Sequence, residues 1–203
     1  ENDVVANADE GYTNGIRLDY VTPRNRPEGL APLARRALGW FTPAEDWYLT
    51  FAVGQNLYTP SDLSQPVPDP RDRPYAGFLY GSVGIAADAG DRLDTLALDF
   101  GIVGPSALGE ETQSFVHRLL RVQDPKGWDF QIRDEIGLRL IYEQKRRFLW
   151  NFEPEIFGLQ ADAAPNFSLA LGNVETSASV GLTLRVGDRL DDTYGPPRVR
   201  PSV

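Results

Sequence analysis

The sequence contains no cysteine, which excludes disulfide bonds, thiolate zinc sites and cysteine nucleophiles. It also contains no methionine and opens at Glu1 into polar residues, so we expect a chain that begins after a removed secretory signal or is a fragment. No apolar run reaches the roughly eighteen residues that a membrane-spanning helix needs. We therefore expect no membrane-spanning helix in this sequence.

Positive charge is scarce, with 20 Lys and Arg residues against 29 Asp and Glu residues and a formal net charge of −9. Binding to nucleic acid needs a surplus of positive charge, so we expect no nucleic-acid partner. The carboxylates are available for a hard cation such as calcium, although an acidic, solvated surface explains them equally well. Frequent glycine (19) and proline (16) favour many short strands joined by tight turns.

Segments with alternating apolar and polar residues recur along the chain. A period of two means that one face of a strand meets an apolar medium and the other a polar one. No internal repeat or linker interrupts the series, so residues 1–203 are interpreted as a single domain. The predicted strands are 15–21, 47–54, 75–86, 93–102, 136–142, 152–159 and 174–186.

Two all-β architectures explain this alternation, a soluble sandwich and an antiparallel transmembrane β-barrel. Aromatic residues near strand ends, the mixture of short and long connections, and a second face rich in small and charged residues favour the barrel. In a barrel, Leu182, Leu184 and Val186 should face lipid. Thr183 and Arg185 should then face the lumen, because a charge facing mid-bilayer lipid costs about 2–4 kcal/mol.

The segment 105–121 breaks the strand pattern and predicts one loop helix. Ser106 is the expected N-cap; acidic residues follow in the first turns, and arginines lie near the end, which complements the helix dipole. An apolar stripe at helical spacing is formed by Leu108, Phe115, Leu119 and Val122. A single helix between strands needs support, and we expect the barrel wall to provide it.

Two long connections are predicted as loops. The first covers residues 24–45 and contains a short helix around 33–38. The second covers residues 59–74, which hold five prolines and no regular period.

The candidate chemistry centres on His117, the only histidine. No Gly-x-Ser-x-Gly elbow exists, so Ser106 and Ser114 lack the setting of a serine nucleophile. A histidine that activates water, with a cation stabilising the oxyanion, remains. Gln113 lies four residues earlier on the same helix face, where its carbonyl would hold one ring nitrogen. Without further context, an ordinary exposed helix histidine explains the residue as well.

A second polar cluster lies at the N-terminal end, in residues 1–3 and 9–15. Its carboxylates and amide oxygens are ligands that suit calcium. The alternative is a polar turn between strands, since Asn14-Gly15 is a strong hairpin signal.

Eight short motifs occur in an order that resembles the lipid A deacylase family of outer-membrane proteins, the LpxR family. They span nearly the whole chain, which makes the combination far more specific than any one motif. The motifs are Glu-Asn-Asp (1–3), Tyr-Thr-Asn-Gly (12–15), Asn-Leu-Tyr-Thr-Pro (56–60), Asp-Arg-Pro-Tyr-Ala-Gly (72–77), Gly-Ile-Val-Gly-Pro-Ser-Ala-Leu-Gly-Glu (101–110), Gln-x-x-x-His (113–117), Gly-Trp-Asp-x-Gln (127–131) and Tyr-Gly-Pro-Pro-Arg (194–198).

The resemblance implies a twelve-stranded barrel of the Gram-negative outer membrane, surrounded by outer-membrane lipids, that acts on lipid A within lipopolysaccharide. It implies calcium-dependent hydrolysis of the ester that holds the 3′ acyloxyacyl chain, at a site between the barrel wall and an extracellular loop helix. His117 would be the base and Asp3 a calcium ligand. Asn2, Thr13 and Gln113 would orient the site.

Three differences from the family stand out, and the first two keep a second hypothesis open. Residues 59–74 contain no lysine where a characterised member has one, so Arg71 or Arg73 would contact a lipid phosphate instead. Gln123 stands where that member has a glutamate. The predicted strands number fewer than twelve, so we expect a barrel truncated at both ends. The alternative function is an outer-membrane barrel of the same fold with impaired catalysis and a structural or binding role.

Overall fold

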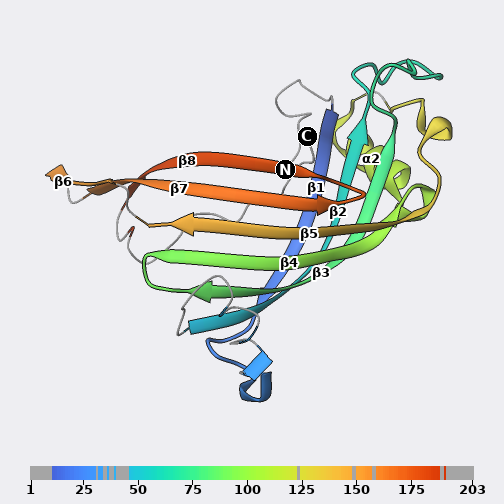
Figure 1. The fold of residues 1–203 in the computed structure, drawn as a ribbon. Coiled ribbons are helices and arrows are strands. Elements are labelled where there is room, and N and C mark those ends of the chain that lie inside the picture. The colour runs from blue at the N-terminus through green and yellow to red at the C-terminus, as the bar shows by residue number, and fades with distance from the viewer. Residues whose placement is uncertain are drawn as a thin grey trace.

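The computed structural model describes residues 11–30, 32–33, 36, 39, 46–122, 124–147, 150–156, 159–187 and 190. Eight antiparallel strands form one curved sheet, part of a barrel wall, and a helix lies at one end of it (Figure 1). The strands are β1 (Gly11–Val21), β2 (Asp46–Thr59), β3 (Ala76–Asp88), β4 (Arg92–Val103), β5 (Glu135–Arg146), β6 (Trp150–Ile156), β7 (Leu159–Gly172) and β8 (Ser177–Gly187). The helical elements are η2 (Glu28–Leu30), η3 (Pro105–Ala107), α2 (Gly109–Leu120) and η4 (Trp128–Phe130).

Consecutive strands pair from β1 to β5, and β7 then pairs with β5, β6 and β8. The expected partial β-barrel is thereby confirmed, but one strand was missed: the region predicted as strand 152–159 contains β6 and the start of β7. Small residues and Pro165 hide the alternation of β7. Pro165 lies between the stretch paired with β6, which ends at Ala163, and the stretch paired with β5, which begins at Asn166. The missing N–H of proline is tolerated at such a break in pairing.

The sheet has an apolar face and a polar face, as the alternation predicts. The apolar face carries exposed side chains from nearly every strand, including Leu18, Val53, Val83, Leu98, Leu138 and Leu184. On β8, Leu182, Leu184 and Val186 are exposed, whereas Arg185 lies on the other face and pairs with Asp162. The predicted register of this strand is therefore confirmed.

The polar face is the concave one. A cavity of about 140 Å³ on this face is lined by side chains from all of β1 to β5. Arg139 is buried there between two carboxylates, with Nη2 2.7 Å from Asp99 and Nη1 2.6 Å from Glu175. Buried charges persist only when they are paired, and this guanidinium has partners on both sides. The polar face therefore has the character of a barrel lumen.

The apolar band has a polar edge at the end of the strands away from α2. Asp94, on the apolar face of β4, accepts hydrogen bonds from Arg92, Tyr142 and Gln144. From Asp94 toward α2, the same face of β4 carries only Leu96, Leu98, Phe100 and Ile102. The band thus runs from this polar cluster to the end of the sheet at which α2 lies. In the described part of the chain, no helix is both long and apolar enough to span a membrane.

Candidate functional site

Helix α2 packs on the apolar, convex face of the sheet, at the ends of β2 and β3. Gly77 of β3 lies so close to the helix that a Cβ atom there would be 3.3 Å from the Gly109 Cα. A Cβ at Gly109 would be 2.6 Å from the Trp128 ring and 3.2 Å from Leu57 of β2. A Cβ at Gly109 would clash with the Trp128 ring, and one at Gly77 would require Ala107 and Gly109 to shift by a few tenths of an ångström, so the two glycines allow the close approach of helix and strand. The expected support of the helix by the barrel wall is therefore confirmed.

The start of the helix differs from the prediction. Residues 105–107 form the separate turn η3, and the N-cap of α2 is Leu108, whose backbone is left-handed with φ 58°. Ser106 is therefore not the cap. Its N–H and hydroxyl donate to the Asp134 carboxylate at 2.8 and 2.6 Å. These two bonds hold the pKa of Asp134 below its usual range, so the contact is present at neutral pH and lost only as the pH falls through that lowered pKa.

Strand β2 also fixes the start of the helix. The Gln55 side-chain amide donates to the backbone oxygens of Ala107 and Leu108 at 2.6 and 3.2 Å. Gln55 lies on the apolar face, two residues from Leu57, so the polar group that interrupts this face has a structural partner. Together with the Ser106–Asp134 contact, it sets the position of the first turn of α2 on the wall.

Gln113 and His117 lie on the face of α2 that is turned toward the wall. Their exposed fractions are 1% and 3%, and Gly109, one turn earlier, is buried with them. Spacing of four residues places the two side chains next to each other on the helix. The two residues share one buried helix face, as predicted; that this face also points toward Asn2, Asp3 and Thr13 stays a prediction. An ordinary exposed histidine is not what the structure shows.

The amide of Gln113 has a defined orientation. The Trp128 indole N–H donates to Gln113 Oε1 at 2.8 Å. An indole nitrogen only donates, so the amide oxygen has to face Trp128 and the NH₂ group has to point the other way. That NH₂ group is buried and has no hydrogen-bond partner among the described residues. The oxygen expected to hold the His117 ring accepts from Trp128, so the Gln113 amide also presents a buried donor to the site.

If this site carries out the water activation expected of His117, we predict that Trp128→Phe lowers its rate about 3–10-fold, the equivalent of one hydrogen bond of roughly 0.5–1.5 kcal/mol. Phenylalanine retains a ring against Gly109 and Tyr75 but cannot fix the Gln113 amide. The check is a double-mutant cycle with Gln113→Leu, measured as rates on the full-length protein. In the Gln113→Leu background the Trp128→Phe change should have no further effect; equal losses in both backgrounds would make Trp128 a packing residue only.

The remaining predicted site residues fall at the edge of the described region or outside it. Thr13 is the extra residue of a β-bulge, since Tyr12 pairs with Tyr58 and Asn14 with the adjacent Leu57. The bulge is therefore opposite the part of β2 on which α2 packs, and bulges near active sites often re-aim side chains. Asn2 and Asp3 lie outside the described residues, as does Gln123.

Other candidate chemistries find little support in the geometry. The Ser106 hydroxyl donates to the Asp134 carboxylate rather than to a histidine, so it is not set up as a nucleophile. Among the described residues there is no group of three His, Cys, Asp or Glu side chains able to hold a metal ion.

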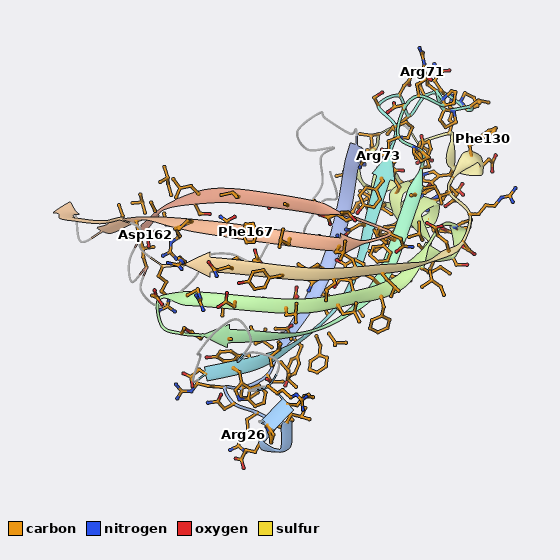
Figure 2. The ribbon with its side chains drawn as sticks, viewed as in Figure 1. Arg26, Arg71, Arg73, Phe130, Asp162 and Phe167 are labelled. Atoms are coloured by element: carbon orange, nitrogen blue, oxygen red, sulfur yellow. The ribbon has the colours of Figure 1, made fainter. Side chains whose placement is uncertain are left out.

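The two arginines proposed for lipid phosphate differ in their surroundings. Both lie at the end of the sheet that carries α2, in the loop between β2 and β3 (Figure 2). Arg71 is almost fully exposed and binds Asp69 at 2.7 Å. The Arg73 guanidinium lies over the Tyr58 ring, 5.5 Å from its centre, and Tyr58 packs with Phe78 on the concave face. Arg71 is thus the more accessible of the two.

Trp128, Asp134 and Gln55 are site-building residues that periodicity and spacing gave no reason to single out. Trp128 belongs to the Gly-Trp-Asp-x-Gln motif, which carried the resemblance without a role for its tryptophan. The one feature of the sequence that could have identified Trp128 is a tryptophan after glycine in a loop. Such a large side chain is usually buried, and its N–H then donates to a hydrogen-bond acceptor. Its acceptor is 15 residues away in sequence and becomes visible only in the fold.

Comparison with known proteins identifies the family. A family model described as "Outer membrane protein LpxR" matches residues 1–203. The structure resembles that of LpxR from Salmonella typhimurium, with a TM-score of 0.67 and 23% identity, over 92% of this chain and 56% of that one. The chain thus spans a little over half the length of that protein, and no curated protein matches it. By the match along its whole length, this chain belongs to the LpxR family of outer-membrane proteins.

Proposed function

We propose that the protein is an ester hydrolase that removes the 3′-linked acyloxyacyl chain from lipid A. The observation that carries the proposal is the position of His117, the only histidine, buried between α2 and the convex face of a barrel wall. In an outer-membrane barrel the convex face meets lipid and the concave face meets water. A site on the convex side favours a substrate that arrives through the leaflet, as lipid A does, over a soluble substrate that arrives through the lumen.

The residues of the site suit hydrolysis by activated water. His117 would take a proton from water as the water oxygen attacks the ester carbonyl carbon, and would return that proton to the departing sugar oxygen. The buried NH₂ group of Gln113, held in place by Trp128, is a donor positioned beside the base. Such a donor would stabilise the negative charge that develops on the carbonyl oxygen.

Calcium enters the proposal through residues at the N-terminal end. Asp3 would supply a carboxylate ligand, and the adjacent Asn2 and the more distant Thr13 carry further oxygen atoms, which are the ligands that calcium takes. When bound, the ion would supply positive charge for the oxyanion. The Thr13 bulge on β1 lies opposite the strand segment below α2, which supports a site shared by the N-terminal residues and the helix.

The second candidate is a barrel of the same family with impaired catalysis. Residues 59–74 contain no lysine, and the arginines of that loop interact with Asp69 and the Tyr58 ring. If a cation from this loop is needed to hold the lipid phosphates, the protein would bind lipid A weakly and turn it over slowly. The activity assay distinguishes the two candidates, because cleavage of lipid A supports the esterase and absence of cleavage supports the impaired barrel.

The assay uses the full-length protein in detergent with purified lipid A and follows the products by mass spectrometry. We expect loss of the 3′ acyloxyacyl chain, with the other ester-linked chains retained. Phospholipid in the same detergent is the control substrate and should be left intact. Absence of any cleavage by a folded, heat-modifiable barrel would support the impaired alternative, and cleavage of phospholipid instead of lipid A would refute the proposed substrate.

A further inference from the structure

Helix α2 presents three different flanks. The flank against the barrel wall is formed by Gly109, Gln113 and His117, all buried. A second flank, made by Glu110, Ser114 and Arg118 at the same four-residue spacing, is polar and accessible. The third flank carries Leu108, Phe115 and Leu119, whose exposed fractions are 51%, 62% and 72%, and the exposed Glu111 lies at its border with the polar flank. We call Leu108, Phe115 and Leu119 the apolar flank of α2.

The apolar flank is the sequence-predicted stripe, but it faces away from the protein. In a water-soluble protein a stripe of this kind would turn to the core, because exposing large apolar side chains to water is unfavourable. Here the wall-facing side is given to the polar pair Gln113 and His117. Something other than the described residues therefore has to shield Phe115 and Leu119 from water.

The surroundings of α2 indicate what covers this flank. The helix lies on the convex apolar face, and Leu79, one outward-facing position beyond Gly77 on β3, is already exposed. From there the apolar face continues through Phe100 and Ile136 across the sheet. In an outer-membrane protein this face contacts acyl chains. The helix packs on this face at the end of the strands, so its apolar flank, which is turned away from the wall, points into the same surroundings as the apolar face.

We propose that α2 is an interfacial helix, with its apolar flank inserted among the acyl chains of the surrounding outer leaflet and its polar flank among the headgroups. An amphipathic helix in this position lies along the membrane surface with its apolar side at the boundary between headgroups and chains. Membrane insertion would hold His117 at the depth of the acyl esters. The inference concerns the lipid around the protein and does not require that lipid A is the substrate.

The absence of cysteine in this sequence makes the test direct, since single cysteines can carry a spin label. In the full-length protein, with any cysteine outside these residues replaced, labels are placed by Phe115→Cys and Leu119→Cys on the apolar flank. Glu110→Cys and Arg118→Cys on the polar flank are matched controls on the same helix. Leu98→Cys, in the middle of the apolar band, supplies the lipid reference.

Each labelled protein is reconstituted into phosphatidylcholine vesicles, and collisions with oxygen and with a water-soluble nickel chelate are measured. We expect the ratio of oxygen to nickel collisions at Phe115→Cys and Leu119→Cys to be several-fold higher than at Glu110→Cys and Arg118→Cys, approaching that at Leu98→Cys. Equal ratios on the two flanks would overturn the proposal. A second result would also overturn the proposal: poor access of both reagents to the label, together with spectral broadening that increases with the ratio of protein to lipid. A second copy of the protein would then cover the flank.

A folding control keeps the result unambiguous. Each variant has to show heat-modifiable migration before labelling. If Phe115→Cys fails to fold, Leu108→Cys on the same flank replaces it, and its neighbour Thr112→Cys is measured alongside. No substrate is present in these experiments, so a failure of the insertion model is distinguishable from a failure of the proposed esterase activity.

Discussion

Replacement of His117 by alanine is expected to lower the rate of lipid A deacylation by roughly 10²–10⁴-fold, the usual contribution of a general base. His117 is the only histidine, so no neighbouring imidazole in this sequence can take over proton transfer. The sheet should remain folded, because α2 packs on the ends of β2 and β3 while the strand ladders run along their full length. The measurement is the initial rate of acyl release from purified lipid A.

The controls for this prediction separate chemistry from packing. His117→Gln keeps a buried polar side chain of similar length against the wall but has no group that takes a proton at neutral pH, so its rate should be as low as that of His117→Ala. Ser106→Ala and Ser114→Ala should retain most of the activity. Loss of activity in either serine variant together with an active His117→Ala would mean that a serine is the nucleophile and that the assigned roles are wrong.

Removal of calcium should have the second large effect. We expect a chelator to lower the deacylation rate by roughly 10²–10³-fold, comparable with the loss of an oxyanion-stabilising group. Asp3→Ala should raise the calcium concentration needed for half-maximal activity, and part of the rate should return at high calcium, because the carboxylate holds the ion and does not itself react. Rates measured across a calcium titration provide the check.

The His117→Ala variant is the matched control for the titration. Its low rate should not recover at any calcium concentration, since the missing group is a base and not a ligand. A deacylation rate that is indifferent to chelation would remove calcium from the proposal. Recovery of His117→Ala at high calcium would instead make His117 part of the ion site.

The fold was predictable where alternation was regular. The strand that ends in Leu182, Leu184 and Val186 was assigned its correct register, because one face carries leucine and valine and the other carries Arg185. Strand β7 escaped prediction. Its sequence mixes alanines, Pro165 and polar residues on both faces, and it acquires its strand conformation from pairing with β5, β6 and β8. Tertiary pairing, rather than local preference, determines such a segment.

The site was predictable only in part, for a related reason. The four-residue spacing of Gln113 and His117 is a local property, and it placed both residues on one helix face. The partner of Gln113 is not local: Trp128 reaches it from η4, after the helix has ended. Likewise Ser106 looked like an N-cap in sequence, but Asp134 offers it a charged acceptor from the segment before β5.

The orientation of α2 could not follow from its pattern alone. An amphipathic helix normally turns its apolar stripe toward the core because water lies on the other side. In this protein the convex face of the sheet is itself apolar, and the polar pair Gln113 and His117 is buried against it. Whether lipid or water surrounds Phe115 and Leu119 therefore determines which side of α2 faces the sheet. The pattern of residues in the helix does not tell lipid from water.

Lipid A extracted from a Gram-negative host that produces the full-length protein tests the central claim most directly. Mass spectrometry should show a new lipid A species that has lost its 3′ acyloxyacyl chain, and this species should be missing when His117→Ala is produced at the same level in the outer membrane. The account would be contradicted if the wild-type protein reached the outer membrane folded and lipid A kept all its chains, or if His117→Ala removed the chain as well as the wild type.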